Sequence, residues 1–284
     1  MASDRLIWLI HNDSSGSNDR EALDGLGRAC EDRGLRIAWR TSFPTEELPT
    51  PAMLDAAGAD LVAIFAGDGT VNAALDALSG WSGAVLVLPG GTMNLLYHRL
   101  FGEQDMDQVL DAVAAARVHR RRPGIIASPL GNAYADLLAG PGTSWNEVRE
   151  AMRKVDVASV ASETRAAFSE TLGGDPVRCQ EPPLGRVEGY PMLQLQPYDQ
   201  HIAVKAYHAE TAERFVEQLV SLVNRDFRSG PYDDLGTTDR LVLAGVAREG
   251  LDLLLDGEPA TTRAACEFVL ARCQVDLLAS VADD

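Results

Sequence analysis

Short apolar runs alternate with stretches of helical spacing over the first 118 residues, and this alternation restricts the fold more than any other feature. Residues 61–66 (LVAIFA) and 84–89 (AVLVLP) are continuously apolar, which is typical of strands buried on both faces of a parallel sheet. The predicted strands are 6–10, 35–40, 61–66 and 84–89, and the predicted helices are about 18–33, 53–60, 70–78 and 106–117. This order predicts a parallel sheet covered by helices on both faces.

The rest of the chain has a different pattern. Strand-like pieces occur at 192–196, 201–207, 240–246, 251–256, 267–272 and 275–279, and residues 124–138 could form one or two strands around a turn. Helical spacing occurs at 144–155, about 159–171 and 210–224, whereas residues 173–191 have the composition of a loop. We therefore expect a mainly antiparallel second part with helical insertions.

This change of pattern predicts two domains. We assign residues 1–120 to the first domain and 121–284 to the second, with the boundary near 118–124, and the last residues could return to the first domain. A chain of 284 residues that is 46% hydrophobic has enough apolar material for both cores. The predicted fold class is α/β, with a three-layer parallel-sheet domain followed by a β-rich domain.

The charge of the chain excludes one class of partner. A net charge of −17 at pH 7 repels a phosphate backbone, so we expect no nucleic-acid binding. Long-range attraction to an anionic membrane is disfavoured for the same reason. The local exception is the basic stretch 117–123 (RVHRRRP), which we interpret as a solvated face or a linker.

Cysteine usage and segment lengths indicate the compartment. The four cysteines lack the spacing of a metal site, so they fit a reduced, cytosolic setting as small core residues. The apolar run at 6–10 is too short for a signal sequence or a membrane span, and no later segment is long enough to span a bilayer. We expect a cytoplasmic protein, with transient peripheral contact at the inner membrane face left open.

Three polar, glycine-bearing loops follow predicted strands of the first domain. They are residues 12–17 (NDSSGS), 66–72 (AGDGTVN) and 89–94 (PGGTMN). The carboxyl ends of parallel strands meet at one edge of the sheet, so we expect these loops to form a common crevice. Glycine lets a backbone approach a ligand closely, and the N–H groups at a helix N-terminus attract anions. The loops therefore predict a polyphosphate site.

The side chains of these loops add neutral hydrogen-bond donors and one notable carboxylate. The neutral donors are Ser15, Ser17, Thr70, Asn72, Thr92 and Asn94, and the loops contain no lysine. Phosphate charge must then be balanced by backbone dipoles and by a divalent cation, which Asp68 could hold directly or through water. Two simpler interpretations stay open: Gly-Asp-Gly is a common turn, and Asn12 and Ser15 could cap a helix.

Taken in order, these loops resemble the diacylglycerol kinase catalytic domain family, which includes bacterial lipid kinases and sphingosine kinases. The family's Asn-Pro-x-Ser-Gly, Gly-Gly-Asp-Gly-Thr and Pro-x-Gly-Thr-x-Asn loops read NDSSG, AGDGT and PGGTMN in this chain. Residues 253–259 (LLLDGEP) look like the family's C-terminal Asp-Gly-Glu motif. The chain departs from the pattern at Asp13, where the family has proline, and at Ala66, where it has glycine. NAD kinases share part of the second loop.

The resemblance implies two domains separated by a cleft, with ATP and Mg²⁺ on the first domain. The phosphates would lie along residues 66–72 and near Thr92, and Thr41 matches a family position close to the nucleotide. The implied nucleotide-binding residues are Asn12, Ser15, Gly16, Thr41, Ala66, Gly67, Asp68, Gly69, Thr70, Asn72, Gly91, Thr92 and Asn94.

The resemblance also implies the catalytic groups. Asp256 would accept the proton of the attacking hydroxyl, with Glu258 orienting it or serving the metal, and Asp68 is the other candidate base. The alternative for Asp256 is a simple hairpin turn, because Asp-Gly between strands is a common turn sequence. Asp199 could match a structural metal ligand of the family, although Gln200 stands where the family has glycine, and an ordinary turn carboxylate fits Asp199 better.

These features predict an ATP- and Mg²⁺-dependent kinase that acts on a lipid hydroxyl, either diacylglycerol-like or sphingoid-like. One alternative is an NAD-kinase-like enzyme with a soluble acceptor, and another is a nucleotide- or lipid-binding relative without catalysis. Residues 140–175 replace the family's glycine-and-aromatic pattern with helical spacing. They could line a different acceptor pocket, lie on a membrane or pack as core, which we favour. A homodimer is left open.

Overall fold

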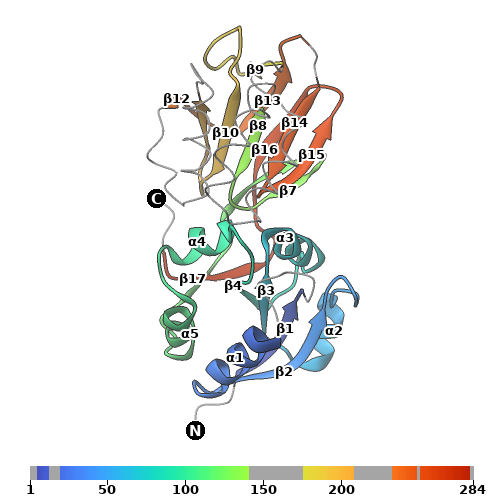
Figure 1. Cartoon of the computed structure of the whole chain (residues 1–284), viewed down its shortest axis with the longest axis vertical. Helices are drawn as coiled ribbons and strands as arrows, with labels where there is room; N and C mark the ends of the chain where they lie inside the picture. Colours follow the sequence, from blue (N-terminus) through green and yellow to red (C-terminus); the bar gives the residue numbers. More distant parts are fainter. Residues whose placement is uncertain (1–4, 13–19, 141–174, 208–231, 248–249, 282–284) are drawn as a thin grey trace. The chain divides into compact units, whose positions relative to one another are not determined.

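The computed structural model divides the chain into two compact units. Unit 1 comprises Met1–Pro123 and Arg272–Asp284, and unit 2 comprises Gly124–Ala271. The structure describes residues 5–12, 20–140, 175–207, 232–247 and 250–281 (Figure 1). Unit 2 is therefore an insertion in the sequence of unit 1, because the chain returns to unit 1 after Ala271.

Unit 1 is built on a six-stranded sheet with the order β2-β1-β3-β4-β17-β5. The strands are β1 (Arg5–His11), β2 (Leu35–Ser42), β3 (Leu61–Ala66), β4 (Ala84–Pro89), β5 (His119–Arg121) and β17 (Asp276–Ala279). The pairs β1·β2, β1·β3, β3·β4 and β17·β4 are parallel, and β5 alone pairs antiparallel, with β17. Every residue of β3 is buried, which is why its sequence is continuously apolar. The predicted mainly parallel sheet is confirmed.

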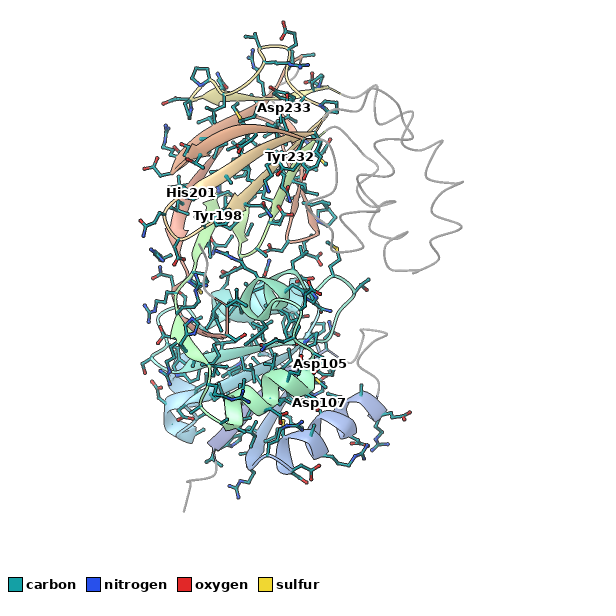
Figure 2. The ribbon with its side chains drawn as sticks, turned by 90° about the vertical axis from the view of Figure 1, so that its left-hand side faces the viewer. Asp105, Asp107, Tyr198, His201, Tyr232 and Asp233 are labelled. Carbon is teal, nitrogen blue, oxygen red and sulfur yellow. The ribbon has the colours of Figure 1, made fainter. Side chains whose placement is uncertain are left out.

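Among the described residues of unit 1, five helices flank this sheet. They are α1 (Arg20–Glu31), α2 (Pro51–Ala57), α3 (Asp68–Ala77), α4 (Leu95–Phe101) and α5 (Met106–Ala114). Figure 1 shows α5 at the left of the sheet and α2 at its right. Asp105, labelled in Figure 2, caps α5: its carboxylate accepts from the Gln108 N–H, and the Gln108 side chain accepts from the Asp105 N–H. This reciprocal arrangement satisfies two backbone donors at the start of the helix.

The described residues of unit 2 form two antiparallel sheets. One has the order β12-β11-β10-β8-β14-β15 and the other β7-β6-β16-β13-β9. The strands are β6 (Gly124–Ser128), β7 (Gly131–Ala133), β8 (Leu137–Gly140), β9 (Val177–Glu181), β10 (Met192–Pro197), β11 (Ile202–Tyr207), β12 (Tyr232–Thr238), β13 (Arg240–Gly245), β14 (Leu251–Leu255), β15 (Glu258–Thr262) and β16 (Cys266–Arg272). One apolar cluster joins residues of both sheets, including Leu195 of β10 and Phe268 of β16. The predicted antiparallel, β-rich part is confirmed.

Two segments differ from the sequence expectation. Val177–Glu181 forms β9 within the stretch expected to be loop, so that expectation is wrong there; Val177 and Cys179 are buried while Glu181 is exposed. His119–Arg121 forms the edge strand β5 inside the basic stretch. Arg122 pairs with Asp276 at 2.7 Å, and Arg121 donates to the Val281 carbonyl oxygen, so these arginines attach the returning chain to unit 1.

The helical spacing predicted for 144–155, about 159–171 and 210–224 lies outside the described residues, and so does the role of most of the 140–175 segment. None of the described helices combines the length and apolar composition that crossing a bilayer requires. All four cysteines are buried and free, as expected of small core residues. Burial raises the pKa of the Cys30 thiol to about 11 and that of Cys179 to about 12.

Candidate functional site

The candidate site of unit 1 lies at the carboxyl ends of three parallel strands. Asn12 follows β1, Gly67 connects β3 to the first turn of α3, and residues 90–94 connect β4 to α4. β1 and β4 both pair with β3, so the three strand ends are neighbours. Parallel pairing therefore brings the three predicted loops to one edge of the sheet.

Asp68 connects the second loop to the third. Its Oδ2 accepts from the Asn94 N–H at 3.0 Å, and its Oδ1 accepts from the Leu95 N–H at 2.8 Å. Asn94 is the N-cap of α4, has a φ of 52°, and provides no side-chain cap for that helix. The carboxylate of Asp68, in the first turn of α3, supplies the missing acceptor for the start of α4.

The side chain of Asn94 stabilises the third loop. Its Oδ1 accepts from the Gly91 N–H at 2.8 Å, and its Nδ2 donates to the Gly91 carbonyl oxygen at 2.9 Å. Asn94 is 7% exposed. Its amide group therefore sets the shape of residues 91–94, and the phosphate-donor role expected for it stays a prediction.

The glycines of these loops allow the two loops to touch. A Cβ on Gly91 would lie 2.5 Å from the Gly67 Cα, and a Cβ on Gly90 would lie 2.5 Å from the Ala66 nitrogen. Real Cβ atoms do not approach backbone atoms so closely. Gly67, Gly90 and Gly91 are not among the residues with positive φ. The absence of a side chain, rather than an unusual backbone angle, explains glycine here.

The first loop meets the second through a hydrogen bond. The Asn12 Nδ2 donates to the Thr70 Oγ1 at 3.1 Å, and Thr70 is 7% exposed. Ser15 and Gly16 lie outside the described residues. The three loops that the sequence analysis grouped are therefore linked in a row by Asn12, Thr70 and Asp68.

The other predicted nucleotide-binding residues of unit 1 vary in their surroundings. Thr41 is 5% exposed, and its Oγ1 accepts from the Trp8 Nε1 at 2.9 Å. Trp8 in turn stacks on Trp39, with ring centroids 5.5 Å apart. Thr92 is exposed and Asn72 is half-buried on α3. Thr92 is therefore accessible to a ligand at this edge.

The electrostatics of the loops favour a bound cation beside any phosphate. Residues 66–72 and 89–94 contain no lysine or arginine. The N-cap of α3 is Gly67, which has no side chain to occupy the first N–H groups of the helix. The described residues include no group of three or more metal-ligating His, Cys, Asp or Glu side chains. A magnesium ion held by one carboxylate and by substrate phosphates fits this donor set.

Unit 2 contains the second predicted group. Asp256 and Gly257 form the two-residue turn between β14 and β15, with φ values of 48° and 83°. The Asp256 Oδ2 accepts from the Tyr134 N–H at 2.6 Å, and its Oδ1 accepts from the Ala135 and Asp136 N–H groups at 2.8 Å each. Asp256 is 2% exposed. The turn between β14 and β15 is confirmed, and the catalytic role of Asp256 stays a prediction.

The remaining predicted residues lie elsewhere in unit 2. Glu258 is half-buried at the start of β15, two residues beyond Asp256. The Asp199 Oδ1 accepts from the Gly124 N–H at 3.1 Å, in the turn between β10 and β11 where Tyr198 and His201 stack (Figure 2). The catalytic role of Glu258 and the metal role of Asp199 stay predictions.

Sequence reasoning missed one buried polar row next to Asp256. The Tyr207 hydroxyl donates to the Gln194 Oε1 at 2.7 Å, and the Gln194 Nε2 donates to the Asp136 Oδ2 at 2.9 Å. Gln194 is 0% exposed and Asp136 7%. Desolvation is the largest cause that raises the pKa of Asp136 to about 7. The only sequence signal was a single aspartate before the apolar residues 137–139.

Comparison with protein families agrees with the loop geometry. Residues 6–124 match the model of the diacylglycerol kinase catalytic domain. This confirms the family resemblance. The matched residues include all three loops of unit 1 and end at its junction with unit 2. Over residues 6–124 the chain is therefore similar to the catalytic domain of a lipid kinase family.

Solved structures share the fold over nearly the whole chain. A diacylglycerol kinase from Bacillus anthracis str. Sterne has a TM-score of 0.59 at 13% identity, with 97% of each chain covered. Two structures described as putative diacylglycerol kinases from the same organism have TM-scores of 0.57 and 0.58 at 14% and 15% identity, with coverages of 97% and 96% of each chain. At these identities the likeness shows the fold alone. No curated protein matches the chain.

Proposed function

We propose that this protein is an ATP- and Mg²⁺-dependent lipid kinase that transfers the γ-phosphoryl group to a lipid hydroxyl. The observation that carries the proposal is the clamp formed by Asp68 on the N–H groups of Asn94 and Leu95. It joins two strand-end loops that match the diacylglycerol kinase catalytic domain at the edge where open α/β sheets bind ligands.

Backbone groups would bind most of the nucleotide phosphate. Residues 66–72 supply the start of α3, and the exposed Thr92 adds a hydroxyl donor. Mg²⁺ would neutralise phosphate charge and polarise the transferred group, with Asp68 as the carboxylate available to hold it in this unit. Because these loops lack basic side chains, we expect activity to depend strongly on the divalent cation.

Asp256 is the proposed base. A lipid hydroxyl attacks the phosphorus atom more readily when a carboxylate accepts its proton in the transition state. The three N–H groups that bind Asp256 restrict the position of its side chain, which favours a fixed catalytic geometry. Glu258 would orient Asp256 or assist the metal, and Asp68 is the alternative base.

The proposed acceptor is a diacylglycerol-like or sphingoid-like lipid, and the proposed location is the cytoplasm with transient contact at the inner membrane face. Support comes from the lipid kinase family of residues 6–124 and from the absence of a membrane-crossing helix among the described residues. The proposal is tested with full-length protein, labelled ATP and Mg²⁺. The acceptors are diacylglycerol in mixed micelles, sphingosine in mixed micelles, NAD in solution, and no acceptor.

We expect labelled lipid in one of the micelle reactions. The labelling should disappear when EDTA removes Mg²⁺. It should also disappear in Asp256→Asn, which should still bind the nucleotide. Phosphorylation of NAD without any lipid product would reject the lipid proposal in favour of the NAD-kinase-like alternative. Nucleotide binding without transfer to any acceptor would indicate a non-catalytic relative. Full activity in Asp256→Asn together with loss in Asp68→Asn would assign the base to Asp68.

A further inference from the structure

The row of Tyr207, Gln194 and Asp136 contains one polar atom whose surroundings do not suit a charge. Asp136 Oδ1 is buried and has no hydrogen-bond partner among the described residues, whereas Oδ2 accepts from Gln194. An isolated buried carboxylate oxygen is unfavourable because it has lost its hydration without a replacement donor. A proton on Oδ1 removes that charge.

The direction of the row determines which oxygen carries the proton. Burial, with the charge of Asp136 as a smaller cause, raises the pKa of Tyr207 well above its usual value, so its hydroxyl keeps its proton and donates. The acceptor is then the Gln194 Oε1, which turns the Gln194 NH₂ group toward Asp136. Oδ2 is consequently an acceptor, and Oδ1 is the only oxygen of Asp136 that can be protonated.

Asp256 and Asp136 have opposite surroundings although they share one backbone segment. Asp256 receives three backbone N–H donors, one of them from Asp136 itself, and the Asp256 N–H donates to the Asp136 carbonyl oxygen. Asp136 receives one side-chain donor, Gln194, and one backbone donor, Leu137, and both effects are smaller than the desolvation that raises its pKa. When two adjacent carboxyl groups have unequal sets of hydrogen-bond donors, their pKa values differ. The group with more donors is ionised and the other is protonated.

We propose that Asp136 is a positioning residue that carries a proton on Oδ1, and that this proton determines the charge that Asp136 exerts on the Asp256 turn. The catalytic consequence rests on the proposed function. The charged groups that act on Asp136 in the described part are Asp256 from the β14–β15 turn and Lys205 from β11. Lys205 also donates to the Gln196 side chain and lies 5.1 Å from the ring centroid of Tyr232.

The proton can be observed without any enzyme assay. In ¹⁵N-labelled full-length protein, the amide signals of residues 134–136 report directly on the segment that binds Asp256. We expect these signals to titrate together between pH 5 and 9 with a midpoint near 7, in keeping with the raised pKa of Asp136. Asp136→Asn keeps the acceptor for Gln194 and should remove the titration. Asp55→Asn makes the same charge change in unit 1, where Asp55 accepts from Trp81, and should leave it intact.

Stability gives a second measurement with a defined sign. The pKa of Asp136 rises from the ordinary 3.8 to about 7 on folding, so the folded state binds the extra proton between these values. Unfolding of unit 2 should therefore become easier as the pH rises from 4 to 7 and should change little above 7. The measurement is hydrogen exchange of the β10 and β11 amides as a function of pH. Asp136→Asn should abolish the pH dependence of stability that these amides report.

The third measurement is kcat of the phosphoryl transfer as a function of pH. Ionised Asp136 raises the proton affinity of the neighbouring Asp256 carboxylate, so kcat of the wild type should exceed that of Asp136→Asn by roughly three- to tenfold at pH 8, with similar values at pH 6 and unchanged KM for ATP. A flat amide profile between pH 5 and 9 in the wild type would overturn the inference. A clear titration in a protein without any phosphoryl transfer would support the proton on Asp136 and reject the proposed function.

Discussion

At the scale of single residues, the candidate site depends on carboxylates that bind backbone N–H groups. Asp68 binds two such groups in unit 1, and Asp256 binds three in unit 2. Both aspartates were identified from their sequence motifs. Asp68 was predicted to bind the divalent cation, and Asp256 was predicted to accept the proton of the attacking hydroxyl. Sequence reasoning could not predict their backbone partners, because Asn94 and residues 134–136 approach only through tertiary folding.

Asp68→Ala should both destabilise unit 1 and abolish phosphoryl transfer. The substitution removes the acceptor for the N–H groups of Asn94 and Leu95, which should lower the free energy of unfolding by about 1–3 kcal/mol. Activity should fall by roughly 100-fold or more. The measurements are urea unfolding followed by tryptophan fluorescence and the labelled-ATP assay.

The matched control is Asp76→Ala, which removes an exposed carboxylate from the same helix, α3. It should change stability by less than about 0.5 kcal/mol and leave activity intact. Wild-type stability and activity in Asp68→Ala would contradict the clamp that supports the proposed function.

At the scale of elements, sequence patterns predicted those strands and helices whose burial follows a simple period. β3 and β4 were predicted within their observed bounds because they are continuously apolar. β9 was missed because its residues, VRCQE, include three polar or charged side chains between glycines and prolines. β5 was not recognised as a strand because arginines and a histidine on an exposed edge have the composition of a loop.

The contact between the β3–α3 loop and the β4–α4 loop is a feature of elements, and it gives a prediction. Gly91→Ala should lower the free energy of unfolding by about 1–3 kcal/mol, because its Cβ would meet the Gly67 Cα at 2.5 Å. We expect nucleotide affinity to fall at the same time, because the two loops must separate. Urea unfolding and equilibrium dialysis with labelled ATP measure the two effects.

Gly25→Ala is the comparison substitution. Gly25 lies within α1, and a Cβ there would have no heavy atom within 4 Å. Replacing this half-buried helical glycine by alanine should stabilise unit 1 by up to about 1 kcal/mol without affecting nucleotide affinity. If Gly91→Ala bound nucleotide as well as Gly25→Ala does, the loop contact would be irrelevant to binding.

At the scale of the whole molecule, the chain order and the structural units differ. β16 and β17 are separated by only three residues, yet β16 pairs with β13 in unit 2 and β17 pairs with β4 in unit 1. A return of the last residues to the first domain was left open from the sequence. The hydrophobic patterns of β16 and β17 do not indicate which strand belongs to which unit. The choice depends on the partner edge that each strand meets during folding.

Paired core substitutions should separate the two units. Leu277→Ala should cost about 2–5 kcal/mol in unit 1, and Phe268→Ala about 3–5 kcal/mol in unit 2, because both side chains are 0% exposed. Hydrogen exchange measures this by segment: Leu277→Ala should accelerate exchange in β3 and β4, and Phe268→Ala in β9 and β13. Equal acceleration in all four strands after either substitution would contradict the division into units.

The insertion of unit 2 into unit 1 has a consequence during synthesis on the ribosome. Residues 124–271 leave the exit tunnel before β17 does. The parallel pairing of β4 with β17 therefore cannot form until the inserted unit has been translated. At elongation rates of about 5–20 residues per second this delay amounts to roughly 7–30 s. During that interval the nascent N-terminal sheet has an open side, which is the kind of surface that holding chaperones cover.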